Sequence, residues 1–422
     1  MNTDPSAEQP NLEIDPDELL QRLPDLTLHL LSDGSIRTDV TGRGILFGPH
    51  TLRVLEVFSQ PMTFKQAMQV LRPNVLGAQD WVDLSDTIRN LYRAGALEPT
   101  VTSSRMPARR TGFDAPVEHV SMLNDRARTE AYLHAIREVV RPNDVVVELG
   151  TGTGVLAVAA AKAGARHVYT IEAGSIGSVA QAVFEANELS DRITLVSGLS
   201  THMSLPERGD VLISEIIGNE PLHERVLEST RDAIKRLLKP EARFVPRTLR
   251  IYAVPVEVPE SVVSKFRFVP SDQAQWGDWY DLDFTPLGRG NPPRAVRIFV
   301  KPHRPRDWTQ SSEPMEVAAI DFSTGHSPSI ESEAYGVASH TASINGILVY
   351  FELGLGPGRI LSVNPQVVDE LCSWRLPVWL LPAPLDVQAG DRLRITYTYS
   401  ATGQHEMVSI SAAPLGEKQA VE

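Results

Sequence analysis

The sequence predicts three parts: an α/β domain with a parallel sheet, an antiparallel β domain after it and a small helical domain before it. Between about residues 116 and 246, near-continuous apolar runs alternate with helical segments, which is typical of parallel strands covered on both faces. After residue 246 the runs alternate apolar and polar residues between glycines and prolines, which favours an antiparallel β-barrel or sandwich. Hydrophobic residues make up 42% of the 422 residues, which excludes a wholly disordered chain.

The N-terminal part, residues 12–100, combines a hairpin with three short helices. The run LTLHLLSDGSIRTDV has two alternating stretches around Asp33-Gly34, a dipeptide suited to a tight turn. Three amphipathic segments follow, and Thr63 is a good N-cap for the second of them. This order predicts a winged-helix-like domain, although none of its helices carries a basic stripe. The Ser-, Arg- and Pro-rich residues 101–115 predict a linker.

In the α/β part, HVSMLNDRARTEAYLHAIREVV predicts a long helical segment over residues 119–140. The runs VVVELG, HVYTIEA, RITLVSG and DVLISE predict four strands. In the β part, strands are expected at RTLRIYAVPVEV, RAVRIFVKP, SINGILVYFELGLG, PVWLLPAPLDV and DRLRITYTYS. The boundary between the two parts is therefore expected near residue 246, and the β domain is expected to span residues 247–415.

Charge and cysteine content narrow the function classes. Lys and Arg total 40 against 53 Asp and Glu, a formal net charge of −13, which argues against nucleic acid as a partner. A cationic substrate would suit this charge, but solubility alone also explains it. The single cysteine, Cys372, excludes an intrachain disulfide and makes a thiolate metal site improbable. Because the N-terminus has no apolar signal core and no apolar run reaches about 20 residues, a cytoplasmic protein that does not bind membranes is expected.

The first chemical signal is ELGTGTG, which follows a predicted strand and opens a helix, and whose glycines are Gly150, Gly152 and Gly154. Glycines allow a sharp turn and close approach of a ligand, and helix N-terminal amides favour an anion. Val155 stands where a dinucleotide site has its third glycine, which disfavours NAD and favours S-adenosylmethionine. Glu172 ends the next predicted strand, where an acid can accept both ribose hydroxyls. A glycine turn without a ligand is the alternative, but the strand–turn–helix context makes ligand binding the better interpretation.

The second signal is SEIIGNEPLHE, which follows the predicted strand DVLIS and so lies at the same edge of the sheet as the glycine loop. Glu215 and Glu224 flank this loop. Two carboxylates can converge on one guanidinium, whose five donors lie in a plane. The alternative is a solvated acidic loop, and the location favours the functional interpretation. Glu220, in mid-loop, is expected to be solvated.

These motifs resemble those of the protein arginine N-methyltransferase family over about residues 116–400. HVSMLNDRART resembles the helix before its sheet, the glycine segment its cofactor motif, SEIIGNEPLHE its double-glutamate loop and CSWRLPVW its threonine–histidine–tryptophan loop. The resemblance implies a Rossmann-like class I methyltransferase domain followed by a β-barrel or sandwich. It implies cofactor binding by Arg128, Glu148, Gly150, Gly152, Gly154, Glu172 and Gly198, catalysis by Glu215 and Glu224, and substrate binding by Trp374.

The sequence also departs from the family pattern. The tyrosine-rich helix of the family is not visible, and only Phe113 lies where a substrate-facing tyrosine is expected. Ser373 occupies the family's histidine position beside the retained tryptophan. His223 and His340 are candidates to replace that histidine, although a structural or surface role suits each better. The N-terminal domain resembles the small winged-helix peptide chaperone of pyrroloquinoline-quinone biosynthesis and related leader-peptide recognition elements.

The resemblance implies transfer of a methyl group from S-adenosylmethionine to a guanidino nitrogen of arginine in a protein or peptide. Two alternatives remain: methylation of free arginine or another small natural-product precursor, and a non-catalytic peptide-binding protein. The family also has a dimerisation arm early in the β domain, so residues 262–286 predict a homodimer contact. Packing in the β-domain core is an almost equal alternative for this segment, whose aromatic residues are Phe266, Phe268, Trp276, Trp279, Tyr280 and Phe284.

Overall fold

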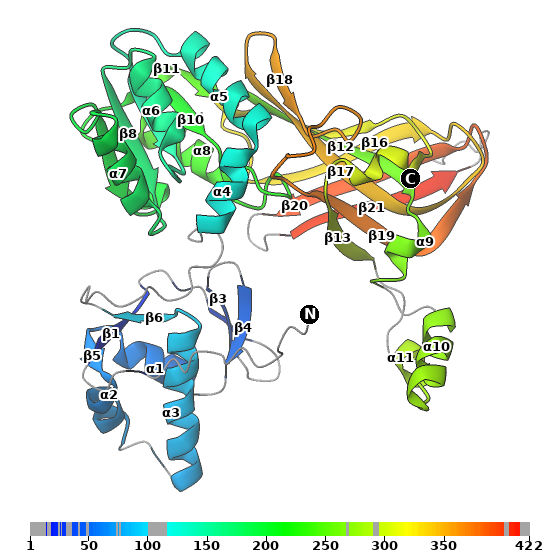
Figure 1. The fold of residues 1–422 in the computed structure, drawn as a ribbon, viewed down its shortest axis with the longest axis horizontal. Helices are drawn as coiled ribbons and strands as arrows, with labels where there is room; N and C mark the ends of the chain where they lie inside the picture. Colours follow the sequence, from blue (N-terminus) through cyan, green and yellow to red (C-terminus); the bar gives the residue numbers. More distant parts are fainter. Residues whose placement is uncertain are drawn as a thin grey trace, which may run out of the picture. The chain divides into compact units, whose positions relative to one another are not determined.

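The computed structural model divides the chain into two compact units, Met1–Ala115 and Pro116–Glu422 (Figure 1). The structure describes residues 14, 18–23, 26, 28–30, 36–40, 43–47, 50–72, 75, 77–99, 116–266, 270–289, 295–400 and 405–413. The turn expected at Asp33-Gly34 and the linker expected at 101–115 lie outside these residues. The boundary expected near residue 246 falls within the second unit.

The first unit has two three-stranded sheets, ordered β5-β1-β6 and β2-β3-β4. Its elements are β1 (Leu19–Arg22), β2 (Leu28–Leu30), β3 (Ile36–Val40), β4 (Arg43–Phe47), α1 (Thr51–Val57), β5 (Met62–Thr63), α2 (Phe64–Leu71), α3 (Ala78–Arg93) and β6 (Leu97–Pro99). The expected hairpin strands pair antiparallel as β2 and β3. Thr63 caps α2 in a capping box with Gln66, because each side chain accepts a hydrogen bond from the other residue's backbone N–H. Phe58, Ile88 and Leu91 are fully buried in this unit's core.

The second unit begins with the helical segment that the sequence predicted, and this segment is divided into two helices. The helices are α4 (Pro116–Asn124) and α5 (Arg126–Val139). Asp125 separates them because its carboxylate accepts a hydrogen bond from the backbone N–H of Arg128 and caps α5. A single capping residue sets this break, so the apolar pattern alone did not reveal it.

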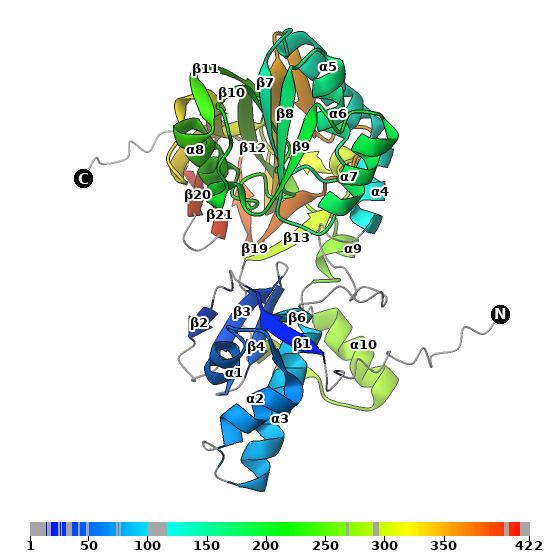
Figure 2. The same ribbon diagram turned by 90° about the vertical axis from the view of Figure 1, so that its left-hand side faces the viewer.

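The parallel sheet of the second unit has the order β11-β10-β7-β8-β9, and Figure 2 shows the strands side by side in this order. The strands are β7 (Val145–Leu149), β8 (His167–Glu172), β9 (Ile193–Ser197), β10 (Gly209–Ser214) and β11 (Leu238–Val245). All four pairings are parallel. The four strands predicted from apolar runs are confirmed. Sequence reasoning missed β11, whose segment LKPEARFV carries charges.

Helices connect these strands in the βαβ manner that a parallel sheet requires. They are α6 (Val155–Lys162), α7 (Gly177–Ala186), the short 3₁₀ helix η3 (Ser200–His202) and α8 (Val226–Arg236). The carboxyl ends of β7, β8 and β10 therefore lie at one edge of the sheet. The glycine loop, Glu172 and the loop that begins at Glu215 follow these three strand ends.

The β-rich part forms a seven-stranded sheet on the path β13-β19-β17-β12-β14, with β15 and β18 paired beside it, and a three-stranded sheet β16-β20-β21. Its strands are β12 (Thr248–Glu257), β13 (Val296–Val300), β14 (Thr309–Gln310), β15 (Met315–Asp321), β16 (Ser329–Val337), β17 (Ala342–Gly356), β18 (Arg359–Ser362), β19 (Leu376–Val387), β20 (Arg392–Ser400) and β21 (His405–Ala413). Every pairing in this part is antiparallel, as expected. Two short 3₁₀ helices, η4 (Arg304–Asp307) and η5 (Phe322–Thr324), join its strands. One buried apolar cluster runs through both the parallel and the antiparallel parts.

The aromatic segment predicted at residues 262–286, called the aromatic insertion below, overlaps three short helices among the described residues. They are α9 (Glu260–Val263), α10 (Pro270–Tyr280) and α11 (Thr285–Arg289). Trp276 and Tyr280 each make an edge-on ring contact with Phe284. Trp279 and Tyr280 remain 61% and 60% exposed. These described rings pack against one another at the surface rather than in the β-domain core. No helix of the described residues is both long and apolar enough to cross a membrane.

Candidate active site

The glycine loop between β7 and α6 bends where the sequence predicted. Gly150, Gly152 and Gly154 have φ angles of 78°, 53° and 83°, a backbone region that residues other than glycine rarely adopt. A Cβ at Gly150 would lie 2.7 Å from Ile216, and one at Gly154 would lie 2.5 Å from the Phe184 ring. These two glycines therefore allow the chain to pack closely against itself.

Gly152 differs, because a Cβ there would meet the ring of His119 on α4 at 3.3 Å. His119 is buried, so α4 covers the glycine loop with a polar ring. Sequence reasoning did not single out His119. Only its position in the segment before Arg128 hinted at it, since no local motif marks a lone histidine as a site residue.

Glu172, at the end of β8, holds the glycine loop. Its carboxylate accepts hydrogen bonds from the backbone N–H groups of Gly152 at 2.9 Å and Gly174 at 2.7 Å. A carboxylate has about four lone-pair positions, so two hydroxyl donors can still be accommodated. Gly198, after β9, donates its backbone N–H to the Glu172 carbonyl oxygen at 2.8 Å. The structure thus brings Glu172, Gly152 and Gly198 together at one edge of the sheet.

Glu148 lies beneath this loop rather than at its surface. It is fully buried and accepts a hydrogen bond from the Thr170 hydroxyl, which also contacts the Thr151 hydroxyl. Its Oε1 atom has no hydrogen-bond partner among the described residues. Burial raises the pKa of this carboxyl to about 8. Such a group supports the glycine loop from below, and its predicted contact with a cofactor stays a prediction.

Arg128, on the first turn of α5, meets the first of the two predicted glutamates. Its Nη2 atom forms an ion pair with Glu215 Oε2, and the two side chains are only 11% and 10% exposed. The Arg128 guanidinium also lies 5.0 Å from the Trp374 ring. Its Nε atom is buried and has no hydrogen-bond partner among the described residues. Arg128, Glu215 and Trp374, which are distant in sequence, therefore form one cluster.

The second predicted glutamate, Glu224, approaches the same arginine. Its side chain is partly buried, and burial raises its pKa to about 7, while the charge of Arg128 acts in the opposite direction. The loop folds back on itself, because a Cβ at Gly218 would lie 3.2 Å from Glu224 Oε1. The two carboxylates thus share Arg128 as an electrostatic neighbour.

The segment just before β19, which contains Ser373 and Trp374, also anchors this cluster. Trp374 donates its Nε1–H to the carbonyl oxygen of Ile217 at 2.7 Å. Ser373, at the family's histidine position, donates its N–H at 2.8 Å and its hydroxyl at 3.1 Å to Asp125. The serine therefore keeps a link to a buried acid without a titratable ring. Of the histidines considered as replacements, His223 is exposed, and His340 Nδ1 bonds the Ser339 hydroxyl.

The expectation that Glu220 is solvated was wrong. The side chain is 3% exposed and forms an ion pair with Arg297 on β13. A mid-loop glutamate looks solvated in sequence because its partner lies 77 residues further along the chain. A buried carboxylate requires such a partner.

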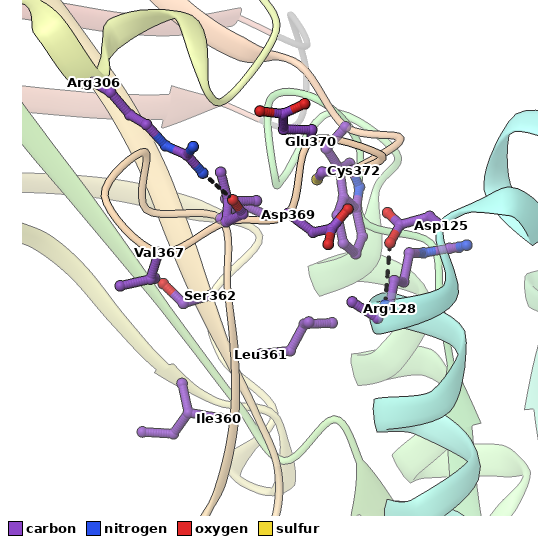
Figure 3. A pocket seen from close by; sticks show the side chains of 14 residues that line it. Asp125, Arg128, Arg306, Ile360, Leu361, Ser362, Val367, Asp369, Glu370 and Cys372 are labelled. Carbon is purple, nitrogen blue, oxygen red and sulfur yellow. Dashed lines mark hydrogen bonds between the residues drawn. The ribbon is translucent and has the colours of Figure 1, made fainter.

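A cavity of about 570 Å³ lies beside the cluster. Figure 3 shows Asp125 and Arg128 on one side of it and Ile360 and Val367 on the other. Trp374 and Cys372 also line it, whereas the glycine loop, Glu215 and Glu224 are not among its lining residues. Burial raises the pKa of the Cys372 thiol to about 12, so this thiol is not a nucleophile at neutral pH. Of the residues predicted to bind the cofactor or the substrate, Arg128 and Trp374 line the cavity, and the others do not.

Comparison with known proteins agrees with this geometry. Residues 125–280 match the profile of the ribosomal protein L11 methyltransferase family (PrmA). The chain is 30% identical over 298 residues to an arginine N(omega)-methyltransferase of Streptomyces achromogenes, spanning 68% of this chain and 77% of the relative. It is 34% identical over 304 residues to protein arginine N-methyltransferase 1 of Schizosaccharomyces pombe, spanning 69% and 84%.

Solved structures show the same fold. A chain of the Trypanosoma brucei PRMT1 enzyme-prozyme heterotetrameric complex with AdoHcy superposes with a TM-score of 0.61 at 24% identity, over 72% of this chain and 95% of that chain. The structure of PRMT6 gives a TM-score of 0.54 at 22% identity, over 70% and 98%. The Rossmann-like domain followed by a β-barrel domain is thus confirmed, while a winged-helix assignment for the first unit stays a prediction. The chain belongs to the protein arginine N-methyltransferase family and is an S-adenosylmethionine-dependent arginine N-methyltransferase.

Proposed function

We propose that Glu215 and Glu224 together hold the acceptor guanidinium and that the acceptor is an arginine in a protein or peptide. The observation that supports this proposal is that both carboxylates interact with Arg128, at the sheet edge where the glycine loop lies. Glu215 forms an ion pair with Arg128, and the charge of Arg128 lowers the pKa of Glu224. Relatives named as protein arginine methyltransferases favour a protein or peptide over free arginine or another small precursor.

The residues at this edge fit S-adenosylmethionine. Arg128 offers a buried Nε–H that lacks a hydrogen-bond partner among the described residues, which suits the carboxylate of the cofactor. Glu172 has lone pairs left for ribose hydroxyls, and the glycine loop exposes backbone at the N-terminus of α6. We assign Arg128, Gly150, Gly152, Gly154, Glu172 and Gly198 to cofactor binding, with Glu148 supporting the loop from below.

When bound, the cofactor supplies a methyl group made electrophilic by its sulfonium. The acceptor nitrogen forms a bond to this methyl carbon as the carbon–sulfur bond breaks, and the electron pair of that bond remains on sulfur. Because arginine keeps its proton at neutral pH, the nitrogen needs carboxylates that orient the guanidinium and draw its positive charge toward the other nitrogens. Glu215 and Glu224 do both, and a proton lost from the reacting nitrogen passes to Glu224.

Glu224 suits the role of proton acceptor because burial raises its pKa to about 7, close to the pH at which a general base works best. Glu215 is paired with Arg128. Trp374 anchors the loop through Ile217 and borders the acceptor position. The two glutamates thus differ in their surroundings, since Glu215 is paired with Arg128 and Glu224 has a pKa near neutrality.

Labelled S-adenosylmethionine tests the acceptor class. The protein is incubated with free arginine, arginine-containing peptides and a protein extract, and tandem mass spectrometry locates the methyl group. We expect methyl-arginine in peptides or proteins. A methyl group found only on free arginine would overturn the protein assignment, and one on lysine, a carboxylate or a hydroxyl would overturn the guanidino assignment.

A homodimer is the assembly we propose. The exposed rings of the aromatic insertion form one apolar surface, with Trp279 and Tyr280 most exposed. The outward side of α4 forms another, because Val117, Val120 and Leu123 are all exposed at helical spacing. Exposed apolar patches of this kind mark protein contacts. The insertion is therefore the candidate dimerisation arm.

We also propose that the first unit is winged-helix-like and binds a peptide segment of the acceptor. Its hairpin, its three helices and its own buried core support this assignment. The net charge of −13 supports a partner other than nucleic acid. We also propose a cytoplasmic location, as expected from the sequence. Deletion of residues 1–115 is expected to leave cofactor binding intact and to weaken binding of a peptide acceptor.

A further inference from the structure

The loop from Glu215 to Glu224 is fixed to the β-rich part at three successive positions. Trp374 Nε1 donates to the Ile217 carbonyl oxygen at 2.7 Å, and the backbone N–H of Arg375 donates to Asn219 Oδ1 at 2.7 Å. Arg297 Nη1 donates to Glu220 Oε1. All three contacts lie between the two glutamates, so they determine the path of the loop from one to the other.

The Glu220 contact differs from the other two because it joins two charges. Arg297 lies on β13, directly opposite Trp379 of β19. Its guanidinium is 5.4 Å from the Trp379 ring and 5.5 Å from the Phe299 ring, so two aromatic rings and one carboxylate surround it. This environment fixes the guanidinium, and the guanidinium in turn fixes the buried Glu220 carboxylate.

We infer that Arg297 and Glu220 form a positioning pair that holds the loop so that Glu215 and Glu224 face the acceptor guanidinium together. The inference rests on the proposed function of those two glutamates. Displacing a catalytic group by about 1 Å costs on the order of 100-fold in rate. Glu220 lies in the middle of the loop, where a small shift moves Glu224 relative to Glu215. Arg297 and Glu220 act through the loop and do not contact the acceptor.

The pair also settles which carboxylates of the loop are offered to the acceptor. The loop carries three glutamates, and a guanidinium can pair with any of them. Glu220 is committed to Arg297, which is itself a guanidinium. Glu215 is also paired, with Arg128, so the acceptor arginine shares Glu215 with Arg128 and meets Glu224, whereas the Glu220 side chain is only 3% exposed.

Another ion pair supplies a matched control. Arg359 of β18 bonds Glu138 of α5 at 2.7 Å, so it also joins the β-rich part to the Rossmann-like part. Neither residue belongs to the loop. Arg359→Met thus removes a cross-part ion pair of the same chemistry without a contact to Glu220.

The test measures kcat and the KM for an arginine peptide at saturating S-adenosylmethionine in the full chain, for Glu220→Gln, Arg297→Met, Arg297→Lys and the double variant Glu220→Gln/Arg297→Met. Calorimetry measures cofactor affinity, and thermal unfolding identifies variants that do not fold. We expect kcat/KM to fall by about 10- to 100-fold in Glu220→Gln and Arg297→Met, with cofactor affinity unchanged. The double variant should be no worse than Arg297→Met, because both changes break one contact. Arg297→Lys should regain part of the rate, since it keeps the charge but not the planar fork.

Full activity of Glu220→Gln would overturn the inference, as would an equal loss in Arg359→Met or a parallel loss of cofactor affinity. If Arg297→Met does not fold, Glu220→Gln, which keeps the shape of the side chain, decides the question by the same criteria. Glu215→Gln separates this inference from the proposed function. An active Glu215→Gln variant contradicts the two-glutamate site itself, whereas an inactive one beside fully active Glu220→Gln contradicts only the positioning pair.

Discussion

The raised pKa of Glu224 makes the reaction pH-dependent near neutrality. In the free protein, burial raises this pKa to about 7 from an ordinary value of 4.5. The ionised form holds the guanidinium and accepts a proton, so kcat/KM follows the ionised fraction. With a pKa of about 7, that fraction is about 0.09 at pH 6 and about 0.9 at pH 8. We therefore expect kcat/KM for a peptide acceptor to rise about 10-fold between pH 6 and pH 8.

Initial rates with labelled S-adenosylmethionine at saturation, measured from pH 5.5 to pH 9, give this profile. The acceptor arginine keeps its charge across the whole range, so it contributes no titration of its own. A profile that is flat between pH 6 and pH 8 would refute the assignment of Glu224 as the titrating group.

The same shift affects stability, with a definite sign. The unfolded chain ionises Glu224 near its ordinary pKa of 4.5, whereas the folded protein keeps the proton up to about pH 7. Folding therefore takes up a proton between these values, and the free energy of unfolding falls as pH rises from about 4.5 to about 7. This difference in pKa between the folded and unfolded chain corresponds to about 3 kcal/mol. Glu224→Gln should lose this part of the fall in urea unfolding, whereas the part due to Glu148 remains.

Three further outcomes are expected. Gly152→Ala, strained at a φ of 53°, and Glu172→Ala, which loses the loop and ribose contacts, should both weaken S-adenosylmethionine binding in calorimetry, and unchanged affinity in both would contradict the cofactor site. Ser373→Ala removes the hydroxyl bond to Asp125 and should lower the free energy of unfolding by about 1 kcal/mol, with no change in the pH profile, because serine does not titrate. Light scattering at micromolar concentration should give a dimer mass, and Trp279→Ser should reduce it, whereas a monomeric wild type would count against the arm.

Local patterns predicted most of the fold. The strands β7, β8 and β10 follow from apolar runs whose burial on both faces leaves little choice of residue. The segment that forms β11 has three charged residues among its eight, so its sequence is typical of a loop. The break between α4 and α5 depends on one capping residue, Asp125, whose carboxylate also serves Ser373. The apolar periodicity of the sequence does not reveal a residue such as Asp125, which caps a helix and also binds a distant serine.

The site divides in the same way. The glycine loop and the loop from Glu215 to Glu224 are continuous motifs, so their positions at the sheet edge could be predicted. The contacts that join the Rossmann-like part to the β-rich part could not, because Trp374 and Ile217 are 157 residues apart and Ser373 and Asp125 are 248 apart. Such contacts depend on how the two parts pack, and a single sequence contains no local signal for that packing.

The claim that two carboxylates hold the acceptor guanidinium is tested most directly by Glu215→Gln and Glu224→Gln. Each amide keeps the shape of the side chain but loses the charge, so a guanidinium held from one side can rotate out of line. Methyl transfer to an arginine peptide, followed by tandem mass spectrometry, is expected to fall by at least about 100-fold in each variant, with S-adenosylmethionine affinity nearly unchanged and the protein folded. Wild-type rates in either variant, or a methyl group on any atom other than a guanidino nitrogen, would contradict the account.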